Sequence, residues 1–202
     1  MILGDIMKID EYKSLLKTKL GEKRYKHSLC VADEAVRLSH LYGGNSDKAY
    51  LAGLLHDIMK DESKQEQLQT LDKFDIILSN VEKRAPKLWH AISGAVYAQK
   101  VLNVSDLEII SAIRYHTTAK KDMSLLETLV YLADFTSMDR DYIGVEEMRH
   151  VVNVNLDKAL YTGLSFTIKD LVMHGCPIHP DTIDAYNEIV IKNNITSGAD
   201  II

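Results

Sequence analysis

Six polar residues that could bind a metal ion stand inside apolar stretches of this 202-residue chain, and two of them, His56 and Asp57, are adjacent in "LAGLLHDIMK". A buried imidazole or carboxylate is costly unless it is paired or bound to a metal ion. Imidazole and carboxylate ligands without thiolates suit Mn²⁺, Fe, Co²⁺ or Zn²⁺ in a hydrolytic site. If these residues converge on one internal point, they predict a metal-dependent hydrolase; the set is His27, His56, Asp57, His90, His116 and Asp134.

Two basic residues stand at helical spacing from this set. Lys60 follows His56 by one turn, and Arg24 precedes His27 by three residues, so each pair would share a helix face. Either cation could neutralise a phosphate beside the ion. His56 and Asp57, as neighbours on a helix, would diverge by about 100° and could still reach an ion lying between those directions.

Each histidine taken alone has a simpler interpretation. A lone histidine on an apolar helix is more often a hydrogen-bonded core residue than a ligand, and a His-Asp dipeptide also arises by chance. His40 and His150 are expected on solvated faces, and His174 in a last helical turn, where a cation suits the dipole. Only the set as a whole favours a metal site.

The elements that must position these residues are helical. The chain has three prolines, and apolar–polar alternation is nowhere sustained, which predicts one all-α domain over 1–202 with about nine helices. One of these helices should contain "LAGLLHDIMK". The other predicted helices include 23–42, 86–102, 106–117, 125–137, 155–174 and 180–193.

Helix ends are marked by capping residues. Gly43 and Gly44 predict a left-handed C-cap. Ser46 should cap the helix that leads to His56. Two S-x-x-E capping boxes are predicted to open later helices, at Ser105 with Glu108 and at Ser124 with Glu127.

Composition narrows the class of protein. The net charge of −5 argues against general affinity for nucleic acid or an anionic membrane. No apolar run is long enough to cross a bilayer, and the acidic N-terminal "MILGDIMKIDEYK" is a poor secretory signal. Cys30 and Cys176 are far apart and predict reduced thiols. A cytoplasmic protein is expected.

The ordered series H…HD…H…H…D resembles the HD superfamily of metal-dependent phosphohydrolases, which are helical bundles. The words "RYKHSLCVADEAVRLSHLYG", "KAYLAGLLHDIMK", "IISAIRYHTTA", "MSLLETLVYLAD" and "PIHPDTIDAYN" are similar to those of the YqeK family, over about residues 20–190. This resemblance implies symmetrical hydrolysis of diadenosine tetraphosphate to two ADP, with iron as the metal. Manganese or another divalent ion, and one or two ions, remain alternatives.

The resemblance also implies roles for individual residues. The implied metal ligands are His27, His56, Asp57 and Asp134. His90 and His116 would face the phosphates or hold a second ion. The remaining nucleotide contacts would come from Arg24, Lys60, Thr117, Arg140 and the segment "GCPIHPD", with Pro177, His179 and Asp181.

Three of these residues are assigned catalytic roles in the expected mechanism. Asp57 would bind the ion and accept a proton from water, Lys60 would neutralise the tetraphosphate, and His116 would protonate the departing ADP. The chain departs from the family pattern at one place. An acidic residue and a proline typically separate the aspartate from the arginine, whereas this chain reads "ADFTSMDRDY" up to and past Arg140.

Other functions stay open at this point. Related folds hydrolyse guanosine tetraphosphate alarmones, deoxynucleoside triphosphates or cyclic nucleotides, and a two-ion site with His90 and His116 would suit phosphodiester cleavage. A non-catalytic nucleotide-binding module is a further alternative. P-loop, Rossmann, zincin and α/β-hydrolase motifs are absent from the sequence. The apolar residues of 142–154 and of the last helix could cover a homodimer partner or close the core.

Overall fold

The structure is a computed structural model that describes residues 7–193, and this part of the chain is an all-helical bundle without strands. The ends of the predicted domain, 1–6 and 194–202, lie outside the described residues. The α-helices are α1 (Ile9–Lys19), α2 (Glu22–Tyr42), α3 (Ser46–Leu55), α4 (Lys64–Lys73), α5 (Asn80–Arg84), α6 (Trp89–Lys100), α7 (Leu107–Tyr115), α8 (Leu125–Thr136), α9 (Val145–Val154), α10 (Leu156–Met173) and α11 (Pro180–Lys192), with a 3₁₀ helix η1 (Pro86–Leu88) before α6.

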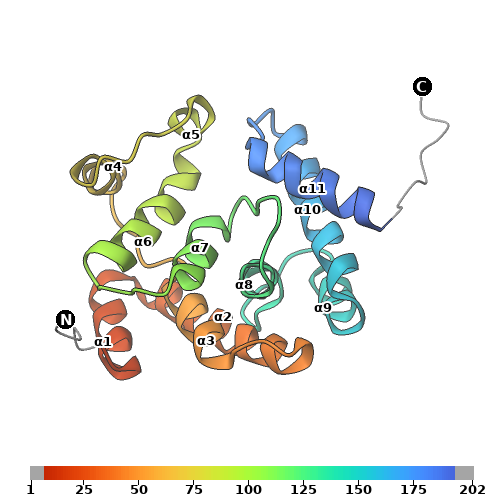
Figure 1. Ribbon diagram of the computed structural model, residues 1–202, viewed down its shortest axis with the longest axis horizontal. Helices are drawn as coiled ribbons and strands as arrows, with labels where there is room; N and C mark the ends of the chain where they lie inside the picture. Colours follow the sequence, from red (N-terminus) through yellow and green to blue (C-terminus); the bar gives the residue numbers. More distant parts are fainter. Residues whose placement is uncertain (1–6, 194–202) are drawn as a thin grey trace.

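Helix α8 lies at the centre of the bundle and is viewed almost end-on in Figure 1. It packs against α2, α7, α9 and α10. Its sequence, LLETLVYLADFT, is apolar on nearly every face, as expected for a helix surrounded by others. Leu129, Val130, Leu132 and Ala133 are fully buried. Asp134 is therefore carried into the interior by the most enclosed helix of the bundle.

Two pairs of helices lie on opposite sides of the bundle in Figure 1. Helices α10 and α11 pack against each other, and α4 packs against α6 on the opposite side of Figure 1. Residues 7–193 form eleven α-helices, more than the predicted nine, and α4 and α5 are among those that no predicted range covers. They are short and polar, so their apolar periodicity is weak.

Several predicted helix ends are confirmed. Gly43 caps α2 in the left-handed conformation, with φ of 78°. Ser124 and Glu127 form the predicted capping box of α8. Two other caps were predicted wrongly by one residue. Asn45, and not Ser46, accepts the backbone N–H of Lys48 at the start of α3. Asp106, one residue after Ser105, caps α7.

The prediction that a helix carries the whole of "LAGLLHDIMK" is wrong. Helix α3 ends at Leu55, and residues 56–61 form turns. Backbone hydrogen bonds run from Ile58 N to Leu55 O and from Lys60 N to Asp57 O, each spanning three residues. The tighter winding replaces the helical relation expected between His56 and Lys60. It leaves His56 at the C-cap and Asp57 in the first turn beyond α3.

Helices α2 and α3 approach each other closely at Gly53. A Cβ atom at this position would lie 2.8 Å from Ala32 Cα and 3.1 Å from Val31 O. Only glycine allows this contact without a shift of backbone. The close approach brings His27 of α2 and His56 at the end of α3 to a ring-centroid distance of 5.2 Å.

Other expectations concern cysteines, solvated histidines and membrane spans. Cys30 and Cys176 are both free, as predicted. His40 and His150 are exposed on helix faces, also as predicted. Within residues 7–193, every helix is too short or too polar to cross a membrane.

Candidate metal centre

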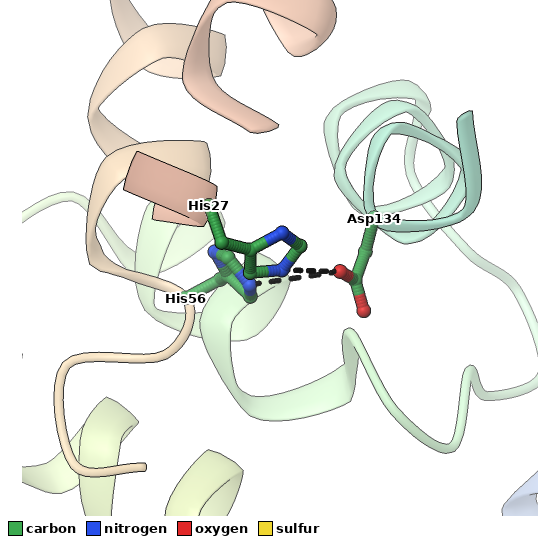
Figure 2. A group of neighbouring side chains, drawn as sticks. All are labelled: His27, His56 and Asp134. Carbon is green, nitrogen blue, oxygen red and sulfur yellow. Dashed lines mark hydrogen bonds and ion pairs between the residues drawn. The ribbon is translucent and has the colours of Figure 1, made fainter. Parts of the chain in front are cut away.

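The six predicted residues come together inside the bundle. They are brought there by α2, the turn after α3, α6, the end of α7 and α8. His56, Asp57, His90 and His116 are at most 2% exposed, and His27 is 4% exposed. Figure 2 shows His27 and His56 directed toward the carboxylate of Asp134.

Two overlapping groups of side chains have ligand atoms within 4.8 Å of one another. The first group is His27, His56 and Asp134, and the second is His56, Asp57 and His116. His27 Nε2 lies 2.9 Å from Asp134 Oδ1. His56 is common to both groups, and its Nε2 lies 3.5 Å from Asp57 Oδ2 and 3.8 Å from Asp134 Oδ1.

Three histidines are held by their Nδ1 atoms. His56 Nδ1 donates to Gly53 O at 2.7 Å, and His116 Nδ1 donates to Ile113 O at 2.8 Å. His27 Nδ1 lies 2.8 Å from a carboxylate oxygen of Asp139. Since a carbonyl or a carboxylate oxygen can only accept, each Nδ1 carries a hydrogen, and the Nε2 atom of each ring is left to face the cluster. The three Nε2 atoms lie beside the carboxylates of Asp134 and Asp57.

Unpartnered buried atoms support a bound cation at this point. His56 Nε2 and Asp57 Oδ1 are buried and have no hydrogen-bond partner in the described part of the chain. Buried polar atoms are rarely left in this state without a water or an ion. The donor set of imidazole nitrogens and carboxylate oxygens is one that divalent transition metals bind. The residues present therefore fit a divalent metal ion.

The charge state of the two carboxylates in the cluster also favours a bound cation. Burial alone would raise the pKa of Asp57, but His56, His116 and His90 outweigh it and hold that pKa well below its usual value. Burial likewise opposes ionisation of Asp134, and His27, His56 and Arg140 lower its pKa far below the usual range. Both carboxylates are thus anions at neutral pH.

Two of the histidines that face Asp57, His90 and His116, are neutral at pH 7. Burial is the main cause that lowers the pKa of His90 to about 4, against a smaller opposite effect of Asp57. Burial lowers the pKa of His116 as well. His90 Nε2 lies 3.1 Å from Asp57 Oδ1 and 3.2 Å from His116 Nε2. Neutral imidazoles are the form that binds a metal.

Three cations surround the cluster. Arg24 donates to Asp57 Oδ2 at 2.7 Å, and Lys60 Nζ lies 3.7 Å from the other oxygen of Asp57. Arg140 donates to the backbone oxygen of Asp134 at 2.6 Å and also pairs with its carboxylate. Arg140 therefore reaches the site despite the altered loop before it. The three side chains are each about one-third exposed, so they can meet a ligand from solvent.

A cavity of about 360 Å³ is lined by Thr117 and Thr118, which directly follow His116 of the cluster in the sequence. Its walls are η1 and the residues around it, the turn after His116, the end of α10 and the segment that leads to α11. Three of the predicted nucleotide contacts line it: Thr117, Pro177 and His179. Thr117 Oγ1 is buried and has no hydrogen-bond partner among the described residues. Asp181 is not among the lining residues; its backbone N–H donates to His179 Nδ1.

The sequence analysis missed a buried carboxylate beside this cavity. Glu82 of α5 pairs with Arg114 of α7, accepts the backbone N–H of Ser79 and lies 3.5 Å from His179 Nε2. Burial opposes the ionisation of Glu82, but its hydrogen bonds with Ser79 and the charge of Arg114 lower the pKa. The S-x-x-E capping pattern of Ser79 and Glu82 was the available signal.

The described geometry agrees with a known family. The family model described as "HD domain" matches residues 24–139, which include all six residues of the cluster. The chain belongs to the HD domain family. This confirms the fold class and the superfamily that the sequence motifs predicted. The HD domain match and the buried His and Asp groups together imply a divalent metal.

Relatives of this HD domain protein match nearly its whole length. A protein of Halalkalibacterium halodurans named "Bis(5'-nucleosyl)-tetraphosphatase, symmetrical" is 35% identical over 88% of this chain and 95% of its own. A Bacillus subtilis protein with the same name is 34% identical over 91% of this chain and 98% of its own. The resemblance to the YqeK family is thereby confirmed.

A solved structure has the same fold as this HD domain. It is a Clostridium acetobutylicum protein described as a "predicted HD superfamily hydrolase involved in NAD metabolism", with a TM-score of 0.89 and 36% sequence identity. The similarity covers 93% of this chain and 99% of the other. The arrangement of helices is therefore that of an HD hydrolase throughout.

Proposed function

We propose that this protein hydrolyses diadenosine tetraphosphate symmetrically to two molecules of ADP. The names of its near-full-length relatives support this substrate. The observation that carries the proposal is the buried His and Asp cluster with three partly exposed cations beside it and a cavity next to it. A polyphosphate needs cations along its length, and a nucleoside needs an enclosed pocket.

We assign the metal to His27, His56, Asp57 and Asp134, with iron as the proposed ion and manganese as the alternative. The chemistry that a bound divalent ion supplies is activation of water at neutral pH and stabilisation of charge on phosphoryl oxygens. The low pKa of Asp57 makes it a weak base. It therefore acts chiefly as a ligand, and its role as a proton acceptor is minor.

The protein's own cations position the phosphates. Arg24 of α2 and Lys60 of the turn after α3 both lie beside Asp57, and Arg140 pairs with Asp134. Each is already oriented by a carboxylate, so little side-chain freedom is lost when a phosphate binds. Phosphoryl transfer depends mainly on such positioning and on compensation of charge.

His116 is proposed to act through the lone pair of its Nε2 atom. Its Nδ1 hydrogen is used on Ile113 O, and burial lowers its pKa, so the ring is neutral and Nε2 carries no hydrogen. Such a ring accepts a proton or binds a second ion. This replaces the expected role of proton donor to the departing ADP.

Nucleoside binding is proposed for the neighbouring cavity. Thr117 lines this cavity and directly follows His116, which connects the cavity to the cluster along the chain. Pro177 supplies apolar surface, and His179 also lines the cavity; its Nε2 atom lies 3.5 Å from Glu82 Oε1 and forms no hydrogen bond in the described part of the chain. Asp181 would act indirectly, because its backbone N–H fixes the ring of His179.

A second candidate function is favoured by the two overlapping ligand groups. Asp57 Oδ2 faces His56, whereas Asp57 Oδ1 faces His90 and His116, so the two oxygens of Asp57 could serve two ions. A two-ion site suits the cleavage of a phosphodiester or of another nucleotide. Product analysis separates the two functions, because only symmetrical cleavage gives two identical nucleoside diphosphates.

The test uses the purified protein, loaded anaerobically with Fe²⁺ and in parallel with Mn²⁺, with products resolved by ion exchange. We expect ADP alone, and its loss together with bound metal in Asp57→Ala. The matched control is Asp47→Ala, an exposed aspartate of α3, which should leave turnover unchanged. ATP plus AMP would refute the symmetrical cut. No turnover with either ion would favour another HD substrate or a binding module.

An arrangement of two copies remains a prediction. Val145, Met148 and Val152 of α9 are buried in the core, whereas Ile143 and Val154 are exposed. In α11, Ala185 is buried. Much of the apolar surface that was considered for a dimer therefore packs in the core. Equilibrium sedimentation of the purified chain would test whether the remaining exposed apolar residues hold two copies together.

A further inference from the structure

The ring of His27 lies between two carboxylates, that of Asp134 in α8 and that of Asp139 in the turn after α8. Its Nε2 faces Asp134 Oδ1 at 2.9 Å inside the cluster, and its Nδ1 faces Asp139 Oδ2 at 2.8 Å on the outer side. We propose that Asp139 is a positioning residue that holds His27 in the tautomer and orientation needed to bind the metal. The inference rests on the metal centre of the proposed function and adds a residue to it.

His27 needs such a partner because of its place in the helix. His56 and His116 stand at the ends of α3 and α7, where a carbonyl three residues earlier is free to accept their Nδ1 hydrogen. His27 lies inside the 21-residue helix α2, where backbone carbonyls are already used by the helix. The acceptor for its Nδ1 must therefore come from another element.

Asp139 is itself held firmly. Ser137, which is fully buried, donates from Oγ to Asp139 Oδ1 at 2.9 Å. Arg149 of α9 donates to the carbonyls of Thr136, Ser137 and Arg140 at 3.1, 2.7 and 3.0 Å. One guanidinium thus fixes the loop on both sides of Asp139. A carboxylate so restrained can orient a ring, whereas a mobile surface aspartate could not.

The same loop is where the sequence departs from the family pattern. An acidic residue and a proline are typical between the metal aspartate and the arginine, and this chain has Phe-Thr-Ser-Met-Asp between Asp134 and Arg140. The acidic residue is present, but it stands immediately before Arg140. The contact with His27 gives this carboxylate a function. A histidine that donates its second nitrogen to a carboxylate is a more basic and better oriented ligand.

The experiment measures metal affinity directly, apart from catalysis. Co²⁺ is titrated into the metal-free full-length protein in competition with a chromophoric chelator, for wild type, Asp139→Asn and Asp139→Glu. We expect Asp139→Asn to weaken the affinity about 10- to 100-fold. Asp139→Glu keeps the carboxylate and should stay within a few-fold of wild type. At saturating metal, KM for the nucleotide should change little.

The matched control is Asp141→Asn, two residues along the same loop. Asp141 is exposed and makes no ion pair or side-chain hydrogen bond within residues 7–193, so its affinity for Co²⁺ should equal that of wild type. Ser137→Ala gives a second approach if Asp139→Asn does not fold. It removes only the Oγ donor to Asp139 and should weaken the affinity several-fold.

Thermal melting of the metal-free variants separates positioning from a structural ion pair. If Asp139→Asn lowers the melting temperature and leaves the affinity for Co²⁺ unchanged, Asp139 is merely structural and the proposal is overturned. If wild type binds Co²⁺ and cleaves no diadenosine tetraphosphate, the proposed substrate fails, whereas the comparison of affinities still tests Asp139.

Discussion

Neutral imidazoles face ionised carboxylates in the metal centre, and this has a consequence for stability against acid. His90 is buried, and its pKa is lowered to about 4 from an ordinary value near 6.5. Between these two pH values the unfolded chain binds a proton on His90 that the folded chain does not. The free energy of unfolding of the metal-free protein should therefore fall as the pH falls from about 6.5 to 4.

Urea denaturation at several pH values would measure this effect. The slope from one histidine is at most about 1.4 kcal/mol per pH unit. His90→Gln should flatten the curve in this window. His150→Gln, at an exposed position, should reproduce the wild-type curve. A His90→Gln curve as steep as that of wild type would contradict the assigned charge state.

The sequence was sufficient to predict the inner residues of the site but not those that orient them. His27, His56 and Asp134 stand out because each follows or interrupts a stretch of apolar residues. Asp139 and Glu82 lie in polar stretches where a carboxylate is ordinary. Asp139 contacts His27, which is 112 positions away in the sequence, and Glu82 contacts Arg114, which is 32 positions away. Only the packed structure reveals such distances.

Among the elements, the contact between α2 and α3 sets the distance between the two ligand-bearing helices. Gly53 permits this contact, and its carbonyl also accepts the Nδ1 hydrogen of His56. In Gly53→Ala the new methyl group would overlap Ala32 and force the helices apart. We expect a loss of about 1 to 3 kcal/mol in the free energy of unfolding, with weaker metal binding.

Gly94→Ala is the matched control for this prediction. A Cβ atom at Gly94 would meet Ile58 and Ile113 at 3.6 Å, which is ordinary contact. Since alanine favours a helix over glycine by about 1 kcal/mol, this variant should be as stable as wild type or more so. Chemical denaturation compares the two, and equal losses in both would show that glycine at Gly53 is not required for packing.

A second prediction concerns the contacts of Glu82 that hold α5 beside the cavity. Glu82 of α5 pairs with Arg114 of α7 and lies 3.5 Å from Nε2 of His179, which itself lines the cavity. Glu82→Gln removes the charge that holds them. We expect KM for the nucleotide to rise several-fold with a smaller change in kcat, and a loss of about 1 to 3 kcal/mol in stability.

Steady-state kinetics would measure KM and kcat of Glu82→Gln, and thermal melting would measure its stability. Glu147→Gln is the control, because Glu147 is an exposed glutamate of α9. If Glu82→Gln lowers kcat and leaves KM unchanged, the network does not serve nucleotide binding.

Predictions of elements succeeded where local signals were strong. The apolar periodicity of 23–42 and the capping box of Ser124 gave α2 and α8 nearly to the residue. The turn at 56–61 was missed because Ile58 and Met59 continue the apolar run of α3. Tertiary contacts of Asp57 and Lys60 outweigh this local preference.

At the scale of the whole molecule, the cluster joins elements from both halves of the described chain. An ion bound there would connect α2, the turn after α3 and α8, so it should stabilise the fold as a whole. Excess ion at about 1,000 times its Kd contributes about 4 kcal/mol. For a domain of this size, that corresponds to a rise of about 8 to 16 °C in Tm.

Differential scanning calorimetry with and without Mn²⁺ would measure this rise. Asp57→Ala should show almost none of it, since the ion has lost a ligand. Asp47→Ala serves again as the control and should show the full increase. A wild-type Tm that does not respond to Mn²⁺ or Fe²⁺ would argue against a metal centre in this cluster.

The three cations around the cluster also bear on how quickly the protein acquires its metal. Arg24, Lys60 and Arg140 are about one-third exposed, whereas the carboxylates they pair with are more enclosed. An incoming divalent ion therefore has to pass close to positive charge on its way to the carboxylates. Added salt screens this repulsion. Stopped-flow loading of the metal-free protein should accordingly be faster at high ionic strength, so the entry rate of the metal is limited by the same residues that attract the phosphates.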